Sequence, residues 1–465
     1  MGGGLLQLVA YGAQDAYISG NPQITFWKGL FKRHTNFAME PFRINFSGQI
    51  QWGTKQTALI GRHADLLYST YVEVVLPKKT ADGADYYWNN EANSLGYNLI
   101  RHVELDIGGQ LIDRMYSEFM FLWGNLTKDL TNSIKLSNLL SGPCANSGAS
   151  ELAYGERCGD DGRKQNMNVV YIPLPFFFTR NPGAALPLIA LQYHEVKINV
   201  LWNEPQFIAG NFTKTTVRDE IRGQDVDLPP IQDLPQAIQA ALYIDYIYLD
   251  TEERRRMAQA SHEYLIEQTQ FNEDKGITGA NNRIDLTFNH PVKELIWVVQ
   301  PSWYTDCRFA AANPGPNASR LRPFTYNQNP VFDQWLQING QDRLDRRYGD
   351  YYSKVQAYQH HTGFLGIGAV DVATLLGGGV SNYIGNLGAY MYSFALRPEE
   401  HQPSGTCNFS RIDTATIVMN MASLGDGTPM NPGLADSSNW NVRVYAVNYN
   451  VLRVMSGMGG LAYSN

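Results

Sequence analysis

Histidines beside carboxylates are the residues of this chain that could bind a metal. His194-Glu195 and His262-Glu263 begin like the H-E-x-x-H motif, in which two histidines one helical turn apart bind zinc and the glutamate acts as a general base. Both have isoleucine where the second histidine is required. His360-His361 would need ligands from elsewhere, and no cluster of histidines and carboxylates of the cupin type is visible. We therefore predict no metal site and no cofactor.

Motifs for nucleophilic catalysis and nucleotide binding are also missing from the sequence. There is no G-x-S-x-G nucleophile elbow and no G-x-x-x-x-G-K-[ST] phosphate loop. The glycines of Met1–Gly4 do not follow a strand, so they cannot form a dinucleotide-binding turn. Carboxylate pairs such as Asp160-Asp161 and Glu399-Glu400 are better explained as solvated loop charge. We predict no catalytic residues and no enzymatic activity.

Five Asn-x-Ser/Thr sequons could accept sugars if they lie on the surface of a secreted protein. Asn45 and Asn408 fall in predicted strands, so the candidate glycosylation sites are Asn125, Asn211 and Asn317. The N-terminus has no basic region followed by an apolar core, so no signal peptide is predicted. The unmodified state is therefore the favoured interpretation.

The composition is that of a β-rich protein that is not basic. The 465 residues include 27 Tyr, 20 Phe, 9 Trp and 42 Gly, which favours strands joined by turns, and the length allows two or three domains. A formal net charge of −7 gives no basic field for nucleic acid. Four cysteines without paired spacing are too few for a disulfide scaffold and suit a reducing compartment.

Two hairpin signals occur in the same sequence context, roughly half a chain apart. Leu105–Gln110 reads L-D-I-G-G-Q, and Leu336–Gln341 reads L-Q-I-N-G-Q. Gly108-Gly109 and Asn339-Gly340 suit two-residue hairpin turns, because both central residues must adopt positive φ. The second pair follows the first by 231 residues (340 − 109). We predict that these four residues form equivalent turns.

Other landmarks repeat in the same order at similar offsets. A strand over 72–76 stops at Pro77, and a strand over 296–299 stops just before Pro301, an offset of 224 (301 − 77). The prolines at 182 and 187 recur at 398 and 403, and a strand is expected after each pair, the second one around 409–412. Three pairs of matching landmarks in the same order predict a duplicated domain of about 200 residues.

The strand pattern within each half predicts the fold class. Apolar and polar residues alternate over 99–107 and 194–200, as in antiparallel sheets with one buried face. Each half has about eight predicted strands, which are separated by long loops. This pattern predicts an all-β fold of two consecutive eight-stranded antiparallel jelly-roll barrels with long inserted loops and short helices. The long insertions are 115–167, 203–238, 303–330 and 346–388, and 118–140 has helical character.

The expected domain limits follow from the repeat. Residues 1–24 mix glycine with scattered apolar residues and form an N-terminal arm that orders only against something else. Residues 25–252 form the first jelly roll, and 253–465 form the second. A charged linker at 250–260 joins them as a short helix.

Five long segments resemble the double jelly-roll major capsid proteins of nucleocytoplasmic large DNA viruses. Within that family, they most resemble the chlorella-virus and marseillevirus-like members. They are Q-L-V-A-Y-G-A-Q-D-A-Y-I-S-G-N-P-Q-I-T-F-W-K near the start, 186–200, 262–271, 397–413 and the ending after 448. The resemblance runs along the whole chain. It departs mainly in the insertions at 115–167 and 346–388.

The resemblance implies a structural protein of the virion, assembled in the host cytoplasm. Three chains would form a homotrimer, a pseudo-hexagonal capsomer that tiles an icosahedral shell. Its partners would be neighbouring capsomers, minor capsid and penton proteins, and the internal viral membrane through minor proteins, with no direct nucleic acid. The loops at 115–167, 203–238, 346–388 and 419–440 would face outward or contact other chains, and the arm would lie on the inner side.

A carbohydrate-binding or carbohydrate-active β-sandwich protein is the alternative hypothesis. It accounts for the many aromatic residues and the acidic loops. It does not account for the full-length resemblance.

Overall fold

The computed structural model of the chain divides into two compact units, Met1–Ala38 and Met39–Asn465. No helix among the described residues is long and apolar enough to cross a membrane. The structure describes residues 2–27, 29, 31–76, 87–88, 95–141, 168–203, 209–210, 215–219, 224–228, 238–277, 281–301, 325–326, 329–363, 386–421 and 440–463.

The N-terminal unit contains short helices and no core of its own. Its elements are α1 (Gly3–Val9), η1 (Ala13–Asp15) and α2 (Ala16–Ser19), and none of them has a buried residue. Helices this short are marginal in water without packing. The unit nevertheless exposes many large apolar side chains, namely Leu5, Leu6, Leu8, Val9, Tyr11, Tyr17, Ile18, Ile24, Phe26, Trp27, Phe31 and Phe37.

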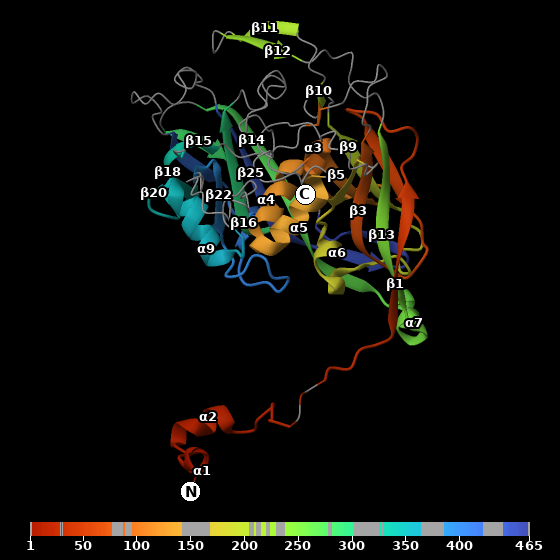
Figure 1. The fold of residues 1–465 in the computed structure, drawn as a ribbon, viewed down its shortest axis with the longest axis vertical. Coiled ribbons are helices and arrows are strands. Elements are labelled where there is room, and N and C mark those ends of the chain that lie inside the picture. Colours follow the sequence, from red (N-terminus) through yellow and green to blue (C-terminus); the bar gives the residue numbers. More distant parts are fainter. Residues whose placement is uncertain are drawn as a thin grey trace, which may run out of the picture. The chain divides into compact units, whose positions relative to one another are not determined.

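The first half of the larger unit forms two antiparallel sheets that enclose a core (Figure 1). One sheet has the order β1-β13-β3-β7, with bounds Phe37–Asn45, Gln239–Leu249, Leu66–Leu76 and Asn168–Pro173. The other has the order β2-β9-β5-β6, with bounds Lys55–Ile60, Val196–Trp202, Ile100–Ile107 and Gln110–Tyr116.

The second half repeats the arrangement. One sheet has the order β14-β25-β16-β22, with bounds His262–Ile277, Trp440–Met455, Pro291–Pro301 and Ala389–Ser393. The other has the order β15-β24-β18-β19, with β20 also on β18; the bounds are Asn282–Asp285, Ala415–Met421, Val331–Ile338, Gln341–Asp342 and Arg347–Tyr348.

Both halves therefore have the same topology. Counted along each half, the first sheet holds the first, eighth, third and sixth main strands, and the second sheet holds the second, seventh, fourth and fifth. This is the order of a jelly roll, which consists of two Greek keys. The predicted all-β double jelly roll is confirmed.

Helices and short strands fill the connections. The helices are α3 (Leu95–Leu99), α4 (Ser117–Leu126), α5 (Leu130–Ser141), α6 (Phe177–Arg180), η4 (Pro182–Ala184), α7 (Thr251–Gln259), η8 (Tyr351–Val355), α9 (Gln356–His360) and η9 (Phe409–Arg411). The short strands are β4 (Tyr87–Trp88), β8 (Leu186–Pro187), β10 (Ala209–Gly210), β11 (Thr215–Asp219), β12 (Gln224–Leu228), β17 (Thr325–Tyr326), β21 (Asn386–Leu387), β23 (Cys407–Asn408) and β26 (Met458–Leu461).

Strand β16 contributes to two hydrophobic cores at once. Leu295, Trp297 and Val299 belong to the core of the second jelly roll, whereas Ile296 and Val298 belong to the core of the first. Each of the five side chains is at most 2% exposed. The sheet β14-β25-β16-β22 is thus buried on both faces along this stretch, which explains why residues 295–299 of β16 are all apolar and do not alternate with polar ones.

Two hairpins join equivalent strands in the two jelly rolls. Ile107 pairs with Gln110 across the first turn, where Gly108 and Gly109 have φ of 62° and 85°. In the second hairpin, Asn339 and Gly340 have φ of 51° and 77°. Positive φ at both central residues matches the twist of the flanking strands.

The strand expected around 409–412 does not form there. Phe409–Arg411 is a single 3-10 turn, and the strand β24 begins only at Ala415. The Asn408 side chain accepts a hydrogen bond from the backbone N–H of Ser410, which starts the turn in the manner of a helix N-cap.

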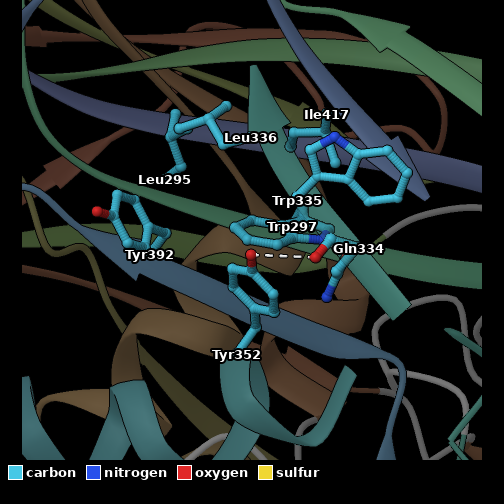
Figure 2. Close-up of a pocket in the computed structure, with 8 residues that line it drawn as sticks. All are labelled: Leu295, Trp297, Gln334, Trp335, Leu336, Tyr352, Tyr392 and Ile417. Carbon is cyan, nitrogen blue, oxygen red and sulfur yellow. Dashed lines mark hydrogen bonds between the residues drawn. The ribbon is translucent and has the colours of Figure 1, made fainter. Parts of the chain in front are cut away.

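The core of the second jelly roll anchors the segment η8 (Figure 2). Tyr352 is 1% exposed, and its hydroxyl donates to the carbonyl oxygen of Gln334 over 3.2 Å. Its ring centroid lies 5.5 Å from that of Trp297, whose indole N–H donates to Gln334 Oε1 over 3.0 Å. One side of the segment is therefore held firmly in the core.

The second hairpin gives a test of backbone strain. Replacing Gly340 with Val should lower the free energy of unfolding by about 1–3 kcal/mol, because a β-branched residue is strained at positive φ. A Cβ at Gly340 meets nothing within 4 Å, so the loss would come from the backbone and not from a clash. Urea unfolding measures it. Gly183→Val, at an exposed glycine without positive φ, is the control, and equal stability of both variants would contradict the turn geometry.

Candidate functional site

The interface between the two jelly rolls gathers several buried aromatic and charged residues. Among the described residues, no group of three or more His, Cys, Asp or Glu side chains is arranged to hold a metal ion. His262 contacts the carbonyl oxygen of Met257, and His194 contacts that of Gly459. His262 and His194 therefore make separate contacts with backbone carbonyls, the second of them across the two jelly rolls. We take the interface itself as the candidate functional site.

Helix α4 fills this interface with aromatic rings. It follows β6 directly, and Figure 1 shows it with α5 between the two sets of strands. The ring centroid of Phe119 lies 5.7 Å from that of Tyr445 on β25. The ring of Tyr116 lies 4.4 Å from that of Phe271 on β14. Aromatic pairs at these separations stabilise a packed contact beyond their buried area.

A buried carboxylate in the first turn of α4 ties the helix to β25. Glu118 is 2% exposed, and its Oε2 accepts a hydrogen bond from the Tyr445 hydroxyl over 2.6 Å. The same oxygen lies 3.0 Å from Nη1 of Arg443. Burial and the nearby Glu118 raise the pKa of Tyr445 well above its ordinary value, so the phenol stays a donor. The first jelly roll thus supplies the acceptor and the second supplies both donors.

A second buried carboxylate collects cations from both jelly rolls. Glu267 on β14 lies 2.7 Å from Lys293 Nζ in its own jelly roll and 2.7 Å from Arg180 Nη1 in the other. The Arg180 guanidinium also lies 4.2 Å from the ring centroid of Trp123 on α4. Burial acts to raise the pKa of Glu267, but the two cations hold it below its usual value. A charge with two partners tolerates burial better than an isolated one.

Hydrogen bonds between side chains and backbone join the edge strand β6 to β14. The backbone N–H of Thr269 donates to Asp113 Oδ1 over 3.0 Å, and the Gln268 side chain donates to the carbonyl oxygen of Ile112. Burial raises the pKa of Asp113 to about 6, although the hydrogen bond from Thr269 opposes the shift. These contacts set the register between the two jelly rolls.

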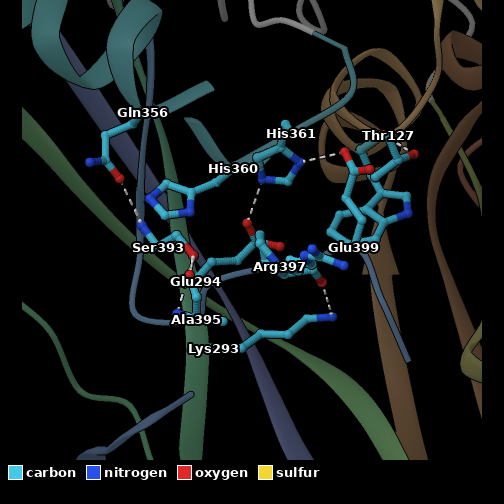
Figure 3. A network of polar contacts seen from close by, with 12 residues as sticks. Thr127, Lys293, Glu294, Gln356, His360, His361, Ser393, Ala395, Arg397 and Glu399 are labelled. Atoms are coloured by element: carbon cyan, nitrogen blue, oxygen red, sulfur yellow. Dashed lines mark hydrogen bonds and ion pairs between the residues drawn. The ribbon is translucent and has the colours of Figure 1, made fainter. Parts of the chain in front are cut away.

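A histidine between two carboxylates clamps the segment that follows α9 (Figure 3). His361 has a fully buried side chain, with Nε2 lying 2.8 Å from Glu294 and Nδ1 lying 2.8 Å from Glu399. Two residues later, the backbone N–H of Gly363 donates to the carbonyl oxygen of Leu126 at the end of α4 over 2.7 Å. The clamp therefore holds this segment against the first jelly roll.

The two carboxylates beside His361 favour its positively charged form. Burial alone would lower the pKa of His361, but Glu294 and Glu399 raise it to about 9. Both ring nitrogens lie at hydrogen-bond distance from carboxylates, which is the arrangement an imidazolium requires. All three residues belong to the second jelly roll, so the arrangement fixes the segment after α9 within it, and the imidazole pairs with both carboxylates.

The residues singled out in the sequence are spread over the molecule. Gly108 lies against the His194 ring, whereas Asn339 accepts hydrogen bonds from the backbone of Asp413 and Thr414 in the second jelly roll. Asn125 is half-buried within α4. Asn211 and Asn317 lie outside the described residues. Glycosylation at these positions stays a prediction.

One copy of a repeated sequence motif lies at this interface. Asp113–Glu118 reads D-R-M-Y-S-E, and Asp345–Asp350 reads D-R-R-Y-G-D, an offset of 232 (345 − 113). The first copy spans the end of β6 and the start of α4, and the second contains β20 and ends just before η8. A residue-by-residue comparison of the two copies could have identified Glu118 as a candidate functional residue, but it could not have identified the residues that Glu118 contacts.

Two family models cover most of the chain. Residues 25–250 match the model for the N-terminus of the major capsid protein. Residues 253–364 and 384–460 match the model for the large eukaryotic DNA virus major capsid protein.

Relatives of known identity match from end to end. The chain is 43% identical to the major capsid protein of Pyramimonas orientalis virus and 37% identical to that of Paramecium bursaria Chlorella virus 1, and each match covers 100% of both chains. Among solved structures, it resembles a chain of the PBCV-1 virus capsid with a TM-score of 0.72 and 32% identity, covering 95% of this chain and 100% of that one. It resembles the Faustovirus major capsid protein in fold, with a TM-score of 0.65 and 12% identity over 96% and 94% of the two chains.

The hydroxyl of Tyr445 gives a test of the interface. Tyr445→Phe should lower the free energy of unfolding by about 1–3 kcal/mol, because it removes a buried hydrogen bond to a carboxylate while keeping the ring. Urea unfolding measures this loss. Tyr463→Phe is the control, since that side chain is 63% exposed. Equal stability of the Tyr445 variant and the wild type would show that the hydroxyl does not stabilise the interface.

The clamp predicts a dependence on pH. His361 has a pKa of about 9 in the folded protein against an ordinary 6.5, so its stabilising contribution is complete below pH 6.5 and is lost as the pH rises through 9. The shift corresponds to about 3 kcal/mol. Urea unfolding between pH 6 and 10 should show this loss in the wild type and in the control His360→Gln. His361→Gln should lack it, and parallel curves for all three would contradict the clamp.

Proposed function

The chain belongs to the major capsid protein family of large eukaryotic DNA viruses, and we propose that three copies close into a trimeric capsomer. The protein itself is a structural component of the virion capsid, as its end-to-end relatives are. In the trimer, six jelly rolls would occupy the six corners of a pseudo-hexagonal block. Such blocks would tile an icosahedral shell.

One observation carries this proposal, namely the head-to-tail contact between the two jelly rolls. The segment after the fifth strand of the first jelly roll packs on the outer face of a sheet in the second. A contact between two unlike surfaces, repeated from unit to unit, closes into a ring when the rotation that relates neighbouring units is a whole fraction of 360°. With two jelly rolls per chain, three chains suffice for six positions. The duplication supports this use, because it provides both surfaces twice.

The rest of the proposal concerns contacts beyond the trimer. The N-terminal unit exposes apolar side chains without a core, which supports a role for the arm in binding neighbouring capsomers or minor and penton proteins. Contact with an internal viral membrane would pass through minor proteins. We propose assembly in the host cytoplasm and no direct binding of nucleic acid, in keeping with the net charge of −7.

We propose further that the protein acts without a cofactor and catalyses no reaction. The buried carboxylates, cations and histidine described above are engaged with one another at the interface. Several of the largest aromatic side chains that motivated the carbohydrate-binding alternative, such as Trp202, Tyr246 and Tyr445, are fully buried. We propose that the first jelly roll comprises residues 25–252 and the second comprises residues 253–465.

The mass of the native protein in solution tests the trimer. Sedimentation at micromolar concentration should give three times the chain mass of 52.2 kDa, because obligate interfaces bury roughly 2,000–5,000 Å² and form without a ligand. A chain that stays monomeric under these conditions would contradict the proposal.

A further inference from the structure

We infer that the segment from Arg347 to Tyr358 of one chain docks on the outer face of the sheet β1-β13-β3-β7 of a second copy, around Tyr71, Tyr171 and Tyr243. The inference rests on the trimer proposed above and assigns the surfaces that join its chains. The two copies of one sequence motif within this chain, Asp113–Glu118 and Asp345–Asp350, lie in different environments.

The first copy of the motif is covered by the chain itself. Tyr116 packs on Phe271 and Tyr445, and Glu118 is 2% exposed beneath Arg443. This contact lies between the segment that follows the fifth strand of one jelly roll and the sheet formed by the first, eighth, third and sixth strands of the other. It is the template for the contact we infer.

The second copy of the motif is exposed. Tyr348, the equivalent of Tyr116, is 68% exposed, and the side chain of Asp350, the equivalent of Glu118, is 47% exposed. The following segment exposes Val355 (40%) and Tyr358 (88%). Its other side is fixed in the core through Tyr352, as Figure 2 shows. Tyr348 packs edge to face on Phe332, which is itself 53% exposed, so the segment presents an aromatic surface that stays open to a second chain.

The sheet equivalent to the covered one is also open on its outer face. Ile296, Val298 and Tyr445 on the covered sheet are buried in the core of the first jelly roll, where Tyr445 packs on Phe119 of α4. On the equivalent sheet of the first jelly roll, Tyr71 and Tyr243 stack with ring centroids 5.2 Å apart and are only half-buried, and Tyr171 is 37% exposed.

These tyrosines form an aromatic platform on three adjacent strands. The rings of Tyr71 and Tyr171 meet edge to face at 6.0 Å. Aromatic residues of this kind, with one polar end, are common anchors of protein interfaces.

The two surfaces have opposite charge. Asp245 and Glu73 lie beside the tyrosines. Burial raises the pKa of Tyr71, and the charges of Asp245 and Glu73 raise it further. The docking segment carries Arg347, whose guanidinium lies 4.9 Å from the ring centroid of Tyr351, and Lys354, whose 54% exposed side chain is ion-paired with Asp350 over 3.0 Å. Two cations and one carboxylate leave the segment with a net positive charge. Opposite charges on facing surfaces steer association and set its orientation. Charge and aromatic character thus both favour a second copy as the occupant.

Charge reversal on the full-length native chain tests this surface. One variant combines Arg347→Glu with Lys354→Glu, a second combines Glu73→Lys with Asp245→Lys, and a third carries all four changes. Either double variant should raise the concentration at which trimers dissociate by about tenfold or more in sedimentation. The fourfold variant should recover at least part of that loss, because every interface of its ring is again complementary.

Matched controls separate docking from folding. Arg283→Glu with Arg411→Glu reverses two exposed cations of the second jelly roll outside the docking segment. Tyr358→Ala removes an exposed ring from the segment, and Tyr463→Ala removes one elsewhere. Only the variants of the docking surfaces should weaken the trimer, and all variants should keep the wild-type melting temperature within a few degrees.

Each outcome is decisive. A wild-type trimer whose docking variants dissociate at the wild-type concentration would overturn the inferred surface and leave the trimer standing. A fourfold variant as weak as the double variants would overturn the charge pairing. A monomeric wild type would overturn the trimer itself, and with it the inference. A docking variant that unfolds is replaced by Tyr358→Ala, whose 88% exposed side chain makes folding insensitive to the change.

Discussion

The burial of one sheet on both faces is the constraint on which the rest of the structure depends. The sheet β14-β25-β16-β22 has a core on its inner side and places Ile296, Val298 and Tyr445 on its outer side. Exposed to water, that outer side would be a large apolar patch. It has to be covered, and α4 of the first jelly roll covers it. This need explains why Met39–Asn465 forms one compact unit and not two separable barrels.

The buried charges give this cover its orientation. Burying Glu118, Arg443, Glu267 and Lys293 is costly, and such pairs seldom stabilise a protein more than apolar residues of the same size. Apolar packing alone, however, would allow α4 to slide along the sheet. Each carboxylate finds its donors in only one register, so we interpret these pairs as the features that select one docking position. An assembly that repeats one contact around a ring requires such a defined angle between its units.

Much of the fold could be predicted from the sequence, because the signals were local. Alternation within strands and the repeated landmarks gave the duplicated jelly roll, and the charged run at 250–260 forms the helix α7 (Thr251–Gln259). The prediction of a strand at 409–412 was wrong. The Asn408 side chain caps a 3-10 turn there, and the alternation of apolar and polar residues does not reveal such a cap. The interface could not be predicted. Glu118 and Tyr445 are separated by 327 positions, and no local pattern in the sequence pairs them.

Images of the purified native assembly test the central claim most directly, that two unequal jelly rolls per chain let three chains fill a sixfold position. Electron micrographs should show three-lobed particles with a pseudo-hexagonal outline, six barrel-like densities and threefold symmetry. Particles with only two barrel-like densities, or rings built from another number of chains, would contradict the account.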